Sequence, residues 1–355
     1  MIKIFTPSFA DEADSNAQNL SVKEIVARLD PARFAVTMLR EGAPDPRIAA
    51  RPNTRLLHWR NHGNTARVMV HLLTHVPDIY FFPREGPLDA AFLKVRRALK
   101  LRTRLVTYVV SGGLYQQAYA ENRQRNIREA DGVVANNTYL AELLKDKIGI
   151  QTAAVIYDAA DRRYFFPKEP SEPFRNLTVL FAGSLRPYKR VPMVVEQAAR
   201  HPDVGFRIAG NGEEEQACRD LAAKLNCSNV EFLGHLSSAQ LGEEMRRADI
   251  FFFPSIIEGH PQVLVQAAAC GLPVVCSRMY RPDFVRDGIT GFLADNDHEF
   301  SEKLDCLIRD RNLRTAMRSA SISHAALYEW SGIARDWEEV FRRVLHGEGP
   351  SEVRA

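Results

Sequence analysis

The chain has 355 residues, of which 45% are hydrophobic, 9% aromatic and 26% charged. At roughly 100–200 residues per domain this length allows about two folded domains, and the composition excludes an intrinsically disordered chain. Lys and Arg number 47 against 44 Asp and Glu, so the net charge is only +3. That small excess does not favour nucleic-acid binding as the general function.

Short apolar runs alternate with stretches of helical spacing along the whole chain, which predicts strand-helix units around parallel sheets. In the first half we predict strands at Ile2–Phe5, Phe34–Met38, Thr54–Leu57, Asp78–Phe82, Leu105–Val110, Gly132–Ala135 and Ala153–Ile156. The first strand-to-helix loop, Pro7 to Asp14, lacks the G-x-G-x-x-G pattern of dinucleotide binding. A dehydrogenase is therefore not favoured.

A basic segment runs from Arg84 to Arg104 and holds seven Lys or Arg residues. A helical projection places apolar residues on one side and cations on the other. The apolar side holds Leu88, Ala91, Phe92, Val95 and Leu99, and the cationic side holds Lys94, Arg96, Arg97 and Lys100. One interpretation is a helix packed on a sheet with a solvated basic face. The other is contact of residues 88–104 with an anionic membrane surface or a phosphate-bearing acceptor.

A proline-rich linker, with Pro167, Pro170 and Pro173, separates the two halves. In the second half we predict strands at Leu177–Ala182, Gly205–Ala209, Val230–Leu233, Ile250–Phe253, Pro273–Cys276 and Gly291–Leu293. The fold class is therefore α/β, with two Rossmann-like, doubly wound domains, residues 1–165 and 166–332, facing a central cleft. Ligands of such sheets bind at the carboxyl ends of the strands.

Two strand-to-helix loops carry most of the chemistry. In the first, Gly183 ends a strand, and Arg186, Lys189 and Arg190 precede a helix. Lysine supplies a point charge and arginine a fork of donors, so the loop suits a diphosphate. The plain alternative is a solvated basic loop.

The second loop joins the strand that ends at Phe253 to a helix that Pro261 opens and Gly271 closes. Amide groups at such a helix start bind anions, and Glu258 and Gln266 would border the ligand. The plain alternative is a strand-helix unit with an incidental glutamate. Close approach to a nucleotide would also explain the glycines after two further strands, in Gly210-Asn211-Gly212 and in Phe232-Leu233-Gly234-His235.

Nothing in the sequence favours a metal or a disulfide. The five cysteines, Cys218, Cys227, Cys270, Cys276 and Cys306, include no C-x-x-C pair. Asp295-Asn296-Asp297 spells a D-x-D pattern, but it follows a predicted strand in a polar run where we expect a turn. There is also no long apolar run and no leader-like first segment. We expect no metal and a cytoplasmic location.

Taken in order, these segments resemble the donor domain of retaining, nucleotide-sugar-dependent glycosyltransferases of the GT-B fold, glycosyltransferase family 4 (glycosyl transferases group 1). The stretch from Glu258 to Val275 resembles the E-x7-E signature of that family, and the Gly183–Arg190 loop resembles its diphosphate loop. The resemblance runs from about residue 130 to 294. It implies metal-independent, retaining hexosyl transfer without a cofactor. The donor would be a UDP or GDP sugar, and the acceptor a glycan or lipid-linked acceptor in cell-surface polysaccharide or glycoconjugate synthesis.

The resemblance also assigns residues. It implies that Lys189, helped by Arg186, neutralises the donor diphosphate, and that Glu258 faces the transferred sugar. The wider donor site would comprise Gly183, Ser184, Gly210, Asn211, Phe232, Leu233, Gly259, His260, Pro261, Gln262, Val263 and Gln266. On the acceptor side we expect Ser15, Asn16, Arg84 and Gly112. Residues 333–355 are expected to cross back onto the first domain.

Three departures keep other functions open. Gln266 replaces the second glutamate of the signature, Ser184 stands where many members have arginine, and a histidine expected after Leu105–Val110 is missing. A catalytically degenerate protein that binds nucleotide or glycan is one alternative. A sugar phosphorylase or epimerase on the same fold is another. Peripheral attachment at the inner face of a membrane is the expectation from the basic segment.

Overall fold

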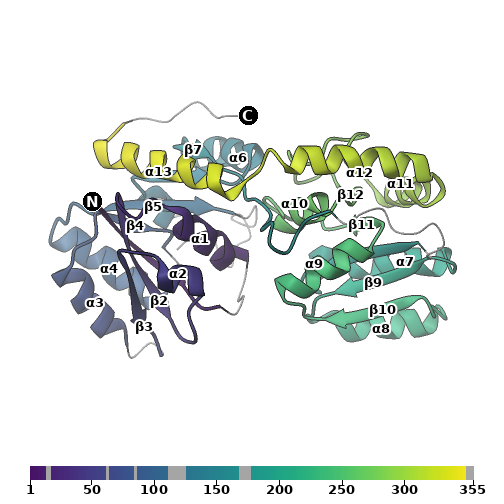
Figure 1. Cartoon of the computed structure of the whole chain (residues 1–355), viewed down its shortest axis with the longest axis horizontal. Coiled ribbons are helices and arrows are strands. Elements are labelled where there is room, and N and C mark those ends of the chain that lie inside the picture. Colours follow the sequence, from purple (N-terminus) through teal and green to yellow (C-terminus); the bar gives the residue numbers. More distant parts are fainter. Residues whose placement is uncertain (13–16, 61–63, 84–85, 111–124, 168–176, 349–355) are drawn as a thin grey trace. The chain divides into compact units, whose positions relative to one another are not determined.

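The computed structural model describes residues 1–12, 17–60, 64–83, 86–110, 125–167 and 177–348. The chain divides into two compact units (Figure 1): unit 1 is Met1–Asp158 with Trp330–Ala355, and unit 2 is Ala159–Glu329. The first boundary therefore lies before the predicted one at residue 165. The reason is that Ala160 and Phe165 are buried in the hydrophobic core of unit 2. The crossing-back segment likewise begins at Trp330 rather than near residue 333.

Unit 1 is built on a seven-stranded parallel sheet with the order β3-β2-β1-β4-β5-β6-β7. The strands are β1 (Ile2–Phe9), β2 (Phe34–Arg40), β3 (Thr54–His58), β4 (Ile79–Phe81), β5 (Arg104–Val109), β6 (Gly132–Ala135) and β7 (Ala154–Val155). Every strand predicted for this half is present. The main difference is β1, which continues to Phe9 through a register shift against β2 between Thr6 and Phe9.

Helices complete unit 1. They are α1 (Ala17–Arg28), α2 (Pro46–Ala50), α3 (Thr65–Thr74), α4 (Pro87–Ala98), α6 (Thr138–Ile148) and α13 (Trp330–His346). Helices α3 and α4 share a core with β1 and β4, in which Val68, Leu72 and Phe92 are buried. The C-terminal helix α13 belongs to this unit because Trp337, fully buried, packs its ring 4.8 Å from that of Phe81.

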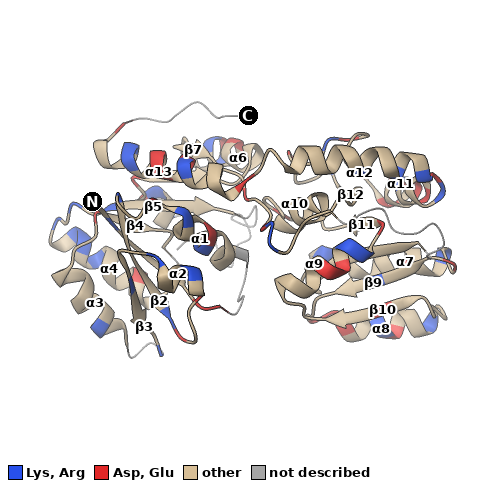
Figure 2. Cartoon of the chain, viewed as in Figure 1, with Lys and Arg blue, Asp and Glu red and all other residues tan. Residues whose placement is uncertain are grey.

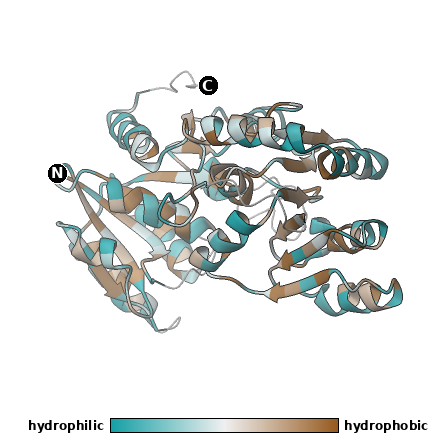
Figure 3. Ribbon diagram, turned by 45° about the vertical axis from the view of Figure 1, so that its right-hand side comes forward, coloured by the Kyte–Doolittle hydropathy of each residue, from teal (hydrophilic) through white to brown (hydrophobic). Residues whose placement is uncertain are grey.

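Unit 2 holds a six-stranded parallel sheet with the order β10-β9-β8-β11-β12-β13. The strands are β8 (Thr178–Ala182), β9 (Gly205–Ala209), β10 (Val230–Gly234), β11 (Ile250–Phe253), β12 (Val274–Ser277) and β13 (Gly291–Ala294). The helices are α7 (Val191–Arg200), α8 (Glu215–Lys224), α9 (Ser238–Arg247), α10 (Gln262–Ala269), α11 (Asp297–Arg309) and α12 (Arg311–Ala325). Hydrophobic colour concentrates on the strands of the sheets (Figure 3).

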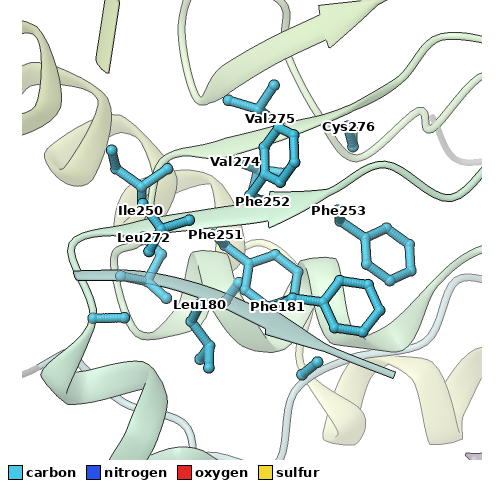
Figure 4. Close-up of a cluster of buried hydrophobic side chains, with 14 of the residues drawn as sticks. Leu180, Phe181, Ile250, Phe251, Phe252, Phe253, Leu272, Val274, Val275 and Cys276 are labelled. Atoms are coloured by element: carbon cyan, nitrogen blue, oxygen red, sulfur yellow. The ribbon is translucent and has the colours of Figure 1, made fainter. Parts of the chain in front are cut away.

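Aromatic side chains fill the centre of unit 2. The Phe253 ring packs against both Phe181 and Phe251, with ring centroids 5.9 Å apart in each pair. Figure 4 shows Leu180, Ile250 and Val274 in the same cluster. Stacked aromatic pairs at this spacing add to the free energy of burial. Because Phe253 is the last residue of β11, this packing fixes the point from which the Glu258 loop departs.

The basic segment forms α4, but its faces differ from the projection. Leu88, Phe92 and Leu93 are buried as an apolar stripe requires. The prediction for Leu99 is wrong, because this residue is 60% exposed. Leu99 is the C-cap residue of α4, with its N–H still donating to Val95 O (2.9 Å), and the chain turns at the next residue, Lys100, whose φ is 49°. Leu99 therefore lies at the exposed end of the helix.

Candidate active site

Three loops at the carboxyl ends of neighbouring strands of unit 2 are joined by backbone hydrogen bonds. The Gly183 N–H donates to Ala209 O (3.0 Å), and the Gly210 N–H donates to Gly234 O (2.7 Å). The Leu185 N–H donates to Asn211 O (2.8 Å). The loops after β8, β9 and β10 therefore form one connected edge. It brings together the predicted residues Gly183, Ser184, Gly210 and Asn211, and Phe232 and Leu233 end the third strand of the group.

Gly210 is required by the approach of the first two loops. A Cβ atom at this position would lie 1.9 Å from Gly183 O, and the φ of Gly210 is 130°. No L side chain fits such a contact without displacing backbone. The sequence predicts close approach of a nucleotide at this glycine, and the structure adds that the neighbouring loop already makes a close approach there.

Lys189 and Glu258 form an ion pair between the two loops singled out in the sequence. Lys189 ends the short 3-10 turn Pro187–Lys189, and its Nζ lies 2.5 Å from Glu258 Oε1. Both side chains are largely shielded, with 12% and 13% of their surface exposed. The ammonium also lies 4.8 Å from the centroid of Phe253, a favourable cation-π distance. These two residues, predicted from separate motifs, are thus brought into one site.

Ser255 is a residue of this site that sequence reasoning did not single out. Its side chain is fully buried, and its Oγ lies 2.5 Å from Glu258 Oε1 and 3.3 Å from Tyr188 O. The Ile256 N–H also donates to Tyr188 O (3.0 Å). Ser255 therefore orients Glu258 and ties its loop to the Lys189 turn. The sequence does offer one indication of this role, because Ser255 lies between Phe253, the last residue of β11, and Glu258.

The other two cations of the first loop differ from Lys189. Arg186 is exposed at the start of the turn. Arg190 points elsewhere, because its Nη2 lies 2.5 Å from Asp297 Oδ1. The D-x-D pattern is also engaged: the Asn296 side chain caps α11 and Asp295 lies 3.2 Å from Arg278 Nε. Of the three cations, Arg186 is exposed, Lys189 pairs with Glu258 of the second loop and Arg190 pairs with Asp297.

The start of α10 lies directly after the Glu258 loop. Pro261 is its N-cap residue, no side chain caps the helix, and Gln262 and Val263 form its first turn. Unsatisfied N–H groups and the positive end of the helix dipole attract anions at such a position. Further along α10, the Gln266 amide is buried. The preceding residues Gly259 and His260 belong to the loop, and the His260 ring lies 6.2 Å from that of Phe284.

The acceptor-side residues predicted from the sequence, Ser15, Asn16, Arg84 and Gly112, lie outside the described residues. Unit 1 does contain a carboxyl group to which the sequence assigned no role. Asp158 is buried, and the Tyr108 hydroxyl donates to its Oδ1 (3.3 Å). Burial raises the pKa of Asp158 to about 6, against the lowering effect of hydrogen bonds from Ser21 and Tyr108.

Two properties of the described residues bear on metal binding and on membrane insertion. Across these residues, no group of three or more His, Cys, Asp or Glu side chains is placed to hold a metal ion. In the same part of the chain, no helix combines the length and apolar character needed to cross a bilayer.

Two parallel-sheet α/β units in one chain are the architecture of the GT-B fold. Solved structures bear this out over nearly the whole chain. Sucrose-phosphate synthase from Thermosynechococcus elongatus aligns with a TM-score of 0.80 at 15% identity, covering 98% of this chain and 100% of that one. Anabaena HepE in complex with UDP and glucose aligns at 0.73 and 17% identity, covering 96% and 100%.

Sequence comparison narrows the likeness to the second half. The family model of glycosyl transferases group 1 matches residues 164–324. An uncharacterized glycosyltransferase of Methanocaldococcus jannaschii is 26% identical over 218 residues, 59% of this chain and 60% of the relative. D-inositol 3-phosphate glycosyltransferase of a Mycobacterium species (strain JLS) is 32% identical over 228 residues, 59% of this chain and 51% of the relative. The matched segment thus spans only half to three fifths of these relatives.

Proposed function

We propose that the protein is a retaining glycosyltransferase that moves a sugar from a nucleotide-diphosphate sugar to a glycan or lipid-linked acceptor. The observation that carries the proposal is the shielded Lys189–Glu258 pair beside the start of α10, which no side chain caps. The group 1 family match, residues 164–324, contains every residue of this site. The HepE structure determined with UDP and glucose supports a nucleotide-sugar donor by analogy of fold.

The proposed chemistry follows from the charges that must be stabilised. Cleavage of a sugar-phosphate bond leaves negative charge on the diphosphate, and preorganised positive groups lower that barrier most. Lys189 and the N–H groups at the start of α10 supply them, with Arg186 on the open side. When the diphosphate binds, the ammonium of Lys189 exchanges the Glu258 carboxylate for phosphate oxygen. Glu258, held by Ser255, then faces the hydroxyls of the sugar.

Retention and the role of metal belong to the same proposal. The leaving phosphate would take the proton of the acceptor hydroxyl on the same face of the sugar, so no separate base from unit 1 is needed. The cations of the chain itself would neutralise the diphosphate. UDP and GDP sugars are the proposed donors, and no cofactor takes part.

We place the reaction in the cytoplasm, at the inner face of a membrane, with an acceptor for cell-surface polysaccharide or glycoconjugate synthesis. The support is the basic segment at residues 88–104. The structure reduces its free charge, because Arg96 and Arg104 both bind Asp131, at 2.6 and 2.9 Å.

The decisive experiment is calorimetric binding of UDP, GDP, ADP and TDP, followed by hydrolysis and transfer assays with sugars of the nucleotide that binds. Lys189→Ala should lower turnover by about 100- to 1,000-fold while leaving the protein folded. Arg190→Ala is the matched control, since Arg190 binds Asp297 instead. Wild-type turnover of Lys189→Ala, or an equal loss in Arg190→Ala, would show that the diphosphate site is misassigned.

A second candidate is a protein that binds nucleotide or glycan without turnover. The observation that favours it is Gln266, whose buried amide replaces a carboxylate of the signature. An amide forms a weaker hydrogen bond with a ribose hydroxyl than a carboxylate does. Nucleotide binding without hydrolysis or transfer across the donor panel would favour this candidate. A gain of affinity in Gln266→Glu would locate the cause.

A further inference from the structure

Unit 1 exposes apolar side chains where two of its helices end. Val70 is 61% exposed and Leu99 60%, and Leu73 and Val76 are exposed beside them in the chain. All four lie on α3, at the end of α4, or in the turn after α3. Isolated exposed aliphatic residues are ordinary, but a group at one edge marks an interaction surface.

Backbone pairing brings these two helix ends together. Strands β4 and β5, which follow α3 and α4, are neighbours in the sheet, and Ile79 pairs with Arg104. The Thr103 Oγ1 donates to Pro77 O (2.7 Å), and the Arg104 N–H donates to Asp78 O (2.8 Å). The turns that contain Val76 and Arg102 are therefore side by side at the amino ends of the strands. This edge is opposite to the carboxyl ends, where ligands of such sheets bind.

Exposed cations lie on α4 and in the segment that follows it. Lys94, Lys100 and Arg102 are exposed, and no carboxylate among the described residues lies within ion-pair distance of them. Helix α3 has no acidic residue, and the only acidic residue of α4, Asp89, is buried and accepts from the Tyr80 hydroxyl (2.6 Å). Figure 2 shows the Lys and Arg residues on these two helices. We call the group Val70, Leu73, Val76, Lys94, Leu99, Lys100 and Arg102 the α3–α4 edge.

The position of Lys100 is unusual for a lysine. Its φ is 49°, and the Leu101 N–H donates back to Arg96 O (3.0 Å), the pattern of a helix end that glycine usually provides. Helix α6 ends at Gly149, with a φ of 71°. A left-handed conformation is unfavourable for a residue with a Cβ atom. The chain thus keeps a cation at the cost of a less favourable helix end.

A cavity of about 510 Å³ adjoins this edge. Its apolar lining is formed by Val76, Pro77, Leu101 and Leu345. Its polar lining is formed by Arg96, Arg102, Thr103, Arg104 and the Asp78 carboxylate, which accepts from the Lys3 N–H (2.7 Å). A cavity that combines an aliphatic wall with a guanidinium suits a phosphate headgroup and the first carbons of an attached chain.

We propose that the α3–α4 edge docks the protein on an anionic lipid bilayer. Leu99, Val70 and their aliphatic neighbours enter the interface, and Lys94, Lys100 and Arg102 contact lipid phosphates. A second copy of the chain is a less suitable occupant, because a two-fold contact would bring the same cations face to face. Docking would bring the enzyme to the membrane that carries a lipid-linked acceptor. This link to an acceptor rests on the proposed function, whereas binding to the bilayer does not.

The test is flotation of the full chain with vesicles of phosphatidylglycerol and phosphatidylcholine, or of phosphatidylcholine alone, at low and high salt. Association is expected with the anionic vesicles at low salt. Lys100→Ala with Arg102→Ala should lower the partition coefficient about 30-fold, since each cation near an anionic surface contributes about a factor of five. Leu99→Ser should lower it about tenfold.

Matched controls come from unit 2. Leu327 is 72% exposed, and Lys224 is an exposed cation in the last turn of α8. Leu327→Ser and Lys224→Ala should change vesicle association less than about twofold, because isolated surface residues contribute little. Lys100→Gly is the most specific variant: it should keep or raise the melting temperature while weakening association about fivefold.

Three results would overturn the proposal. One is absence of binding to anionic vesicles at low salt, and another is equal loss in the unit 2 controls. The third is a dimer in sedimentation that Leu99→Ser dissociates, which would assign the edge to a second copy. Nucleotide binding is measured on the same preparations. If the protein binds nucleotide but not vesicles, the docking proposal is contradicted and the proposed function is unaffected. If it binds vesicles but not nucleotide, only the proposed function is contradicted.

Discussion

Unit 1 buries charged side chains, whereas unit 2 buries no Asp, Glu, Lys or Arg among its described residues. The buried charged residues of unit 1 are Lys23, Glu24, Asp45, Arg51, Asp89, Asp158 and Glu338. The Lys189–Glu258 pair of unit 2 is shielded but not fully buried, and it lies in two loops. A buried charge must be paired to be tolerated. Several charges in the first half of the sequence therefore serve the packing of unit 1, whereas the Lys189–Glu258 pair of the second half lies in the candidate site.

The largest expected effect tests whether the edge of unit 2 depends on backbone contact. Gly210→Ala places a Cβ atom against Gly183 O and requires a φ of 130° that alanine avoids. We expect a loss of about 3 kcal/mol or more in the free energy of unfolding, with at least tenfold weaker nucleotide binding. Gly234→Ala is the control, with a φ of 67° and no atom within 4 Å; it should cost about 1–2 kcal/mol. Stability is measured by urea denaturation and nucleotide binding by calorimetry. Equal losses in the two variants would exclude the contact with Gly183 O as the cause.

The next prediction tests the buried charges of unit 1. Glu24 binds Arg28, and its Oε1 lies 2.6 Å from Arg47 Nη2. Glu24→Ala should lower the free energy of unfolding by about 3 kcal/mol, because breaking a buried ion pair leaves charge without its partner. The exposed pair Glu215–Arg219 in unit 2 is the matched control, with an expected change below about 1 kcal/mol.

The tryptophans make this measurement specific. The chain has three, Trp59, Trp330 and Trp337, and all belong to unit 1. Tryptophan fluorescence in urea therefore follows unit 1 alone, and circular dichroism follows both units. A shift of the fluorescence transition with Glu215→Ala, or none with Glu24→Ala, would contradict the contrast between the units.

A third prediction concerns pH. The pKa of Asp158 in the folded protein is raised to about 6 from an ordinary 3.8, so its contribution to stability is present below pH 3.8 and is lost as pH rises through 6. Asp158→Asn removes this loss. It should raise the free energy of unfolding at pH 8 by up to about 3 kcal/mol, and the gain should vanish near pH 4. A gain that is equal at both pH values would show that ionisation of Asp158 is not its source.

The smallest effect sharpens the role of Ser255. Ser255→Ala removes the hydroxyl that holds Glu258 Oε1 at 2.5 Å. We expect kcat/KM for the donor to fall about tenfold, since a hydrogen bond to a charged group contributes on that order. Ser277, buried at the end of the neighbouring strand β12, accepts from the Met279 N–H (3.1 Å) and is the matched control. Transfer rates that fall equally in Ser277→Ala would indicate a general packing effect.

Much of this architecture could be predicted from the sequence. The strands were predictable because buried parallel strands are short apolar runs, such as Ile250–Phe253. Lys189 and Glu258 were predictable because each follows a strand in a loop that enters a helix. Their mutual contact required the order of strands in the sheet, which places β8 beside β11.

The remaining features depend on contacts far apart in the chain. Arg190 looked equivalent to Lys189 until the fold brought Asp297 to it, 107 residues away. Leu99 fits the apolar stripe of the helical projection, but it is the C-cap residue of α4 and is exposed at the helix end. The boundary near Asp158 depends on which core receives Phe165, and the composition of a proline-rich linker does not encode that choice.

The position of α13 has a consequence for synthesis. Its residue Trp337 packs on Phe81 and Tyr108, and Glu338 accepts from the Asp30 N–H (2.7 Å). The core of unit 1 therefore lacks one wall until the ribosome has made α13, whereas unit 2 is continuous in sequence. At about 5–20 residues per second, synthesis of the 17 residues of α13 gives unit 2 a lead of about 1 to 3 seconds. The part of the protein that leaves the ribosome first is then the part that folds last.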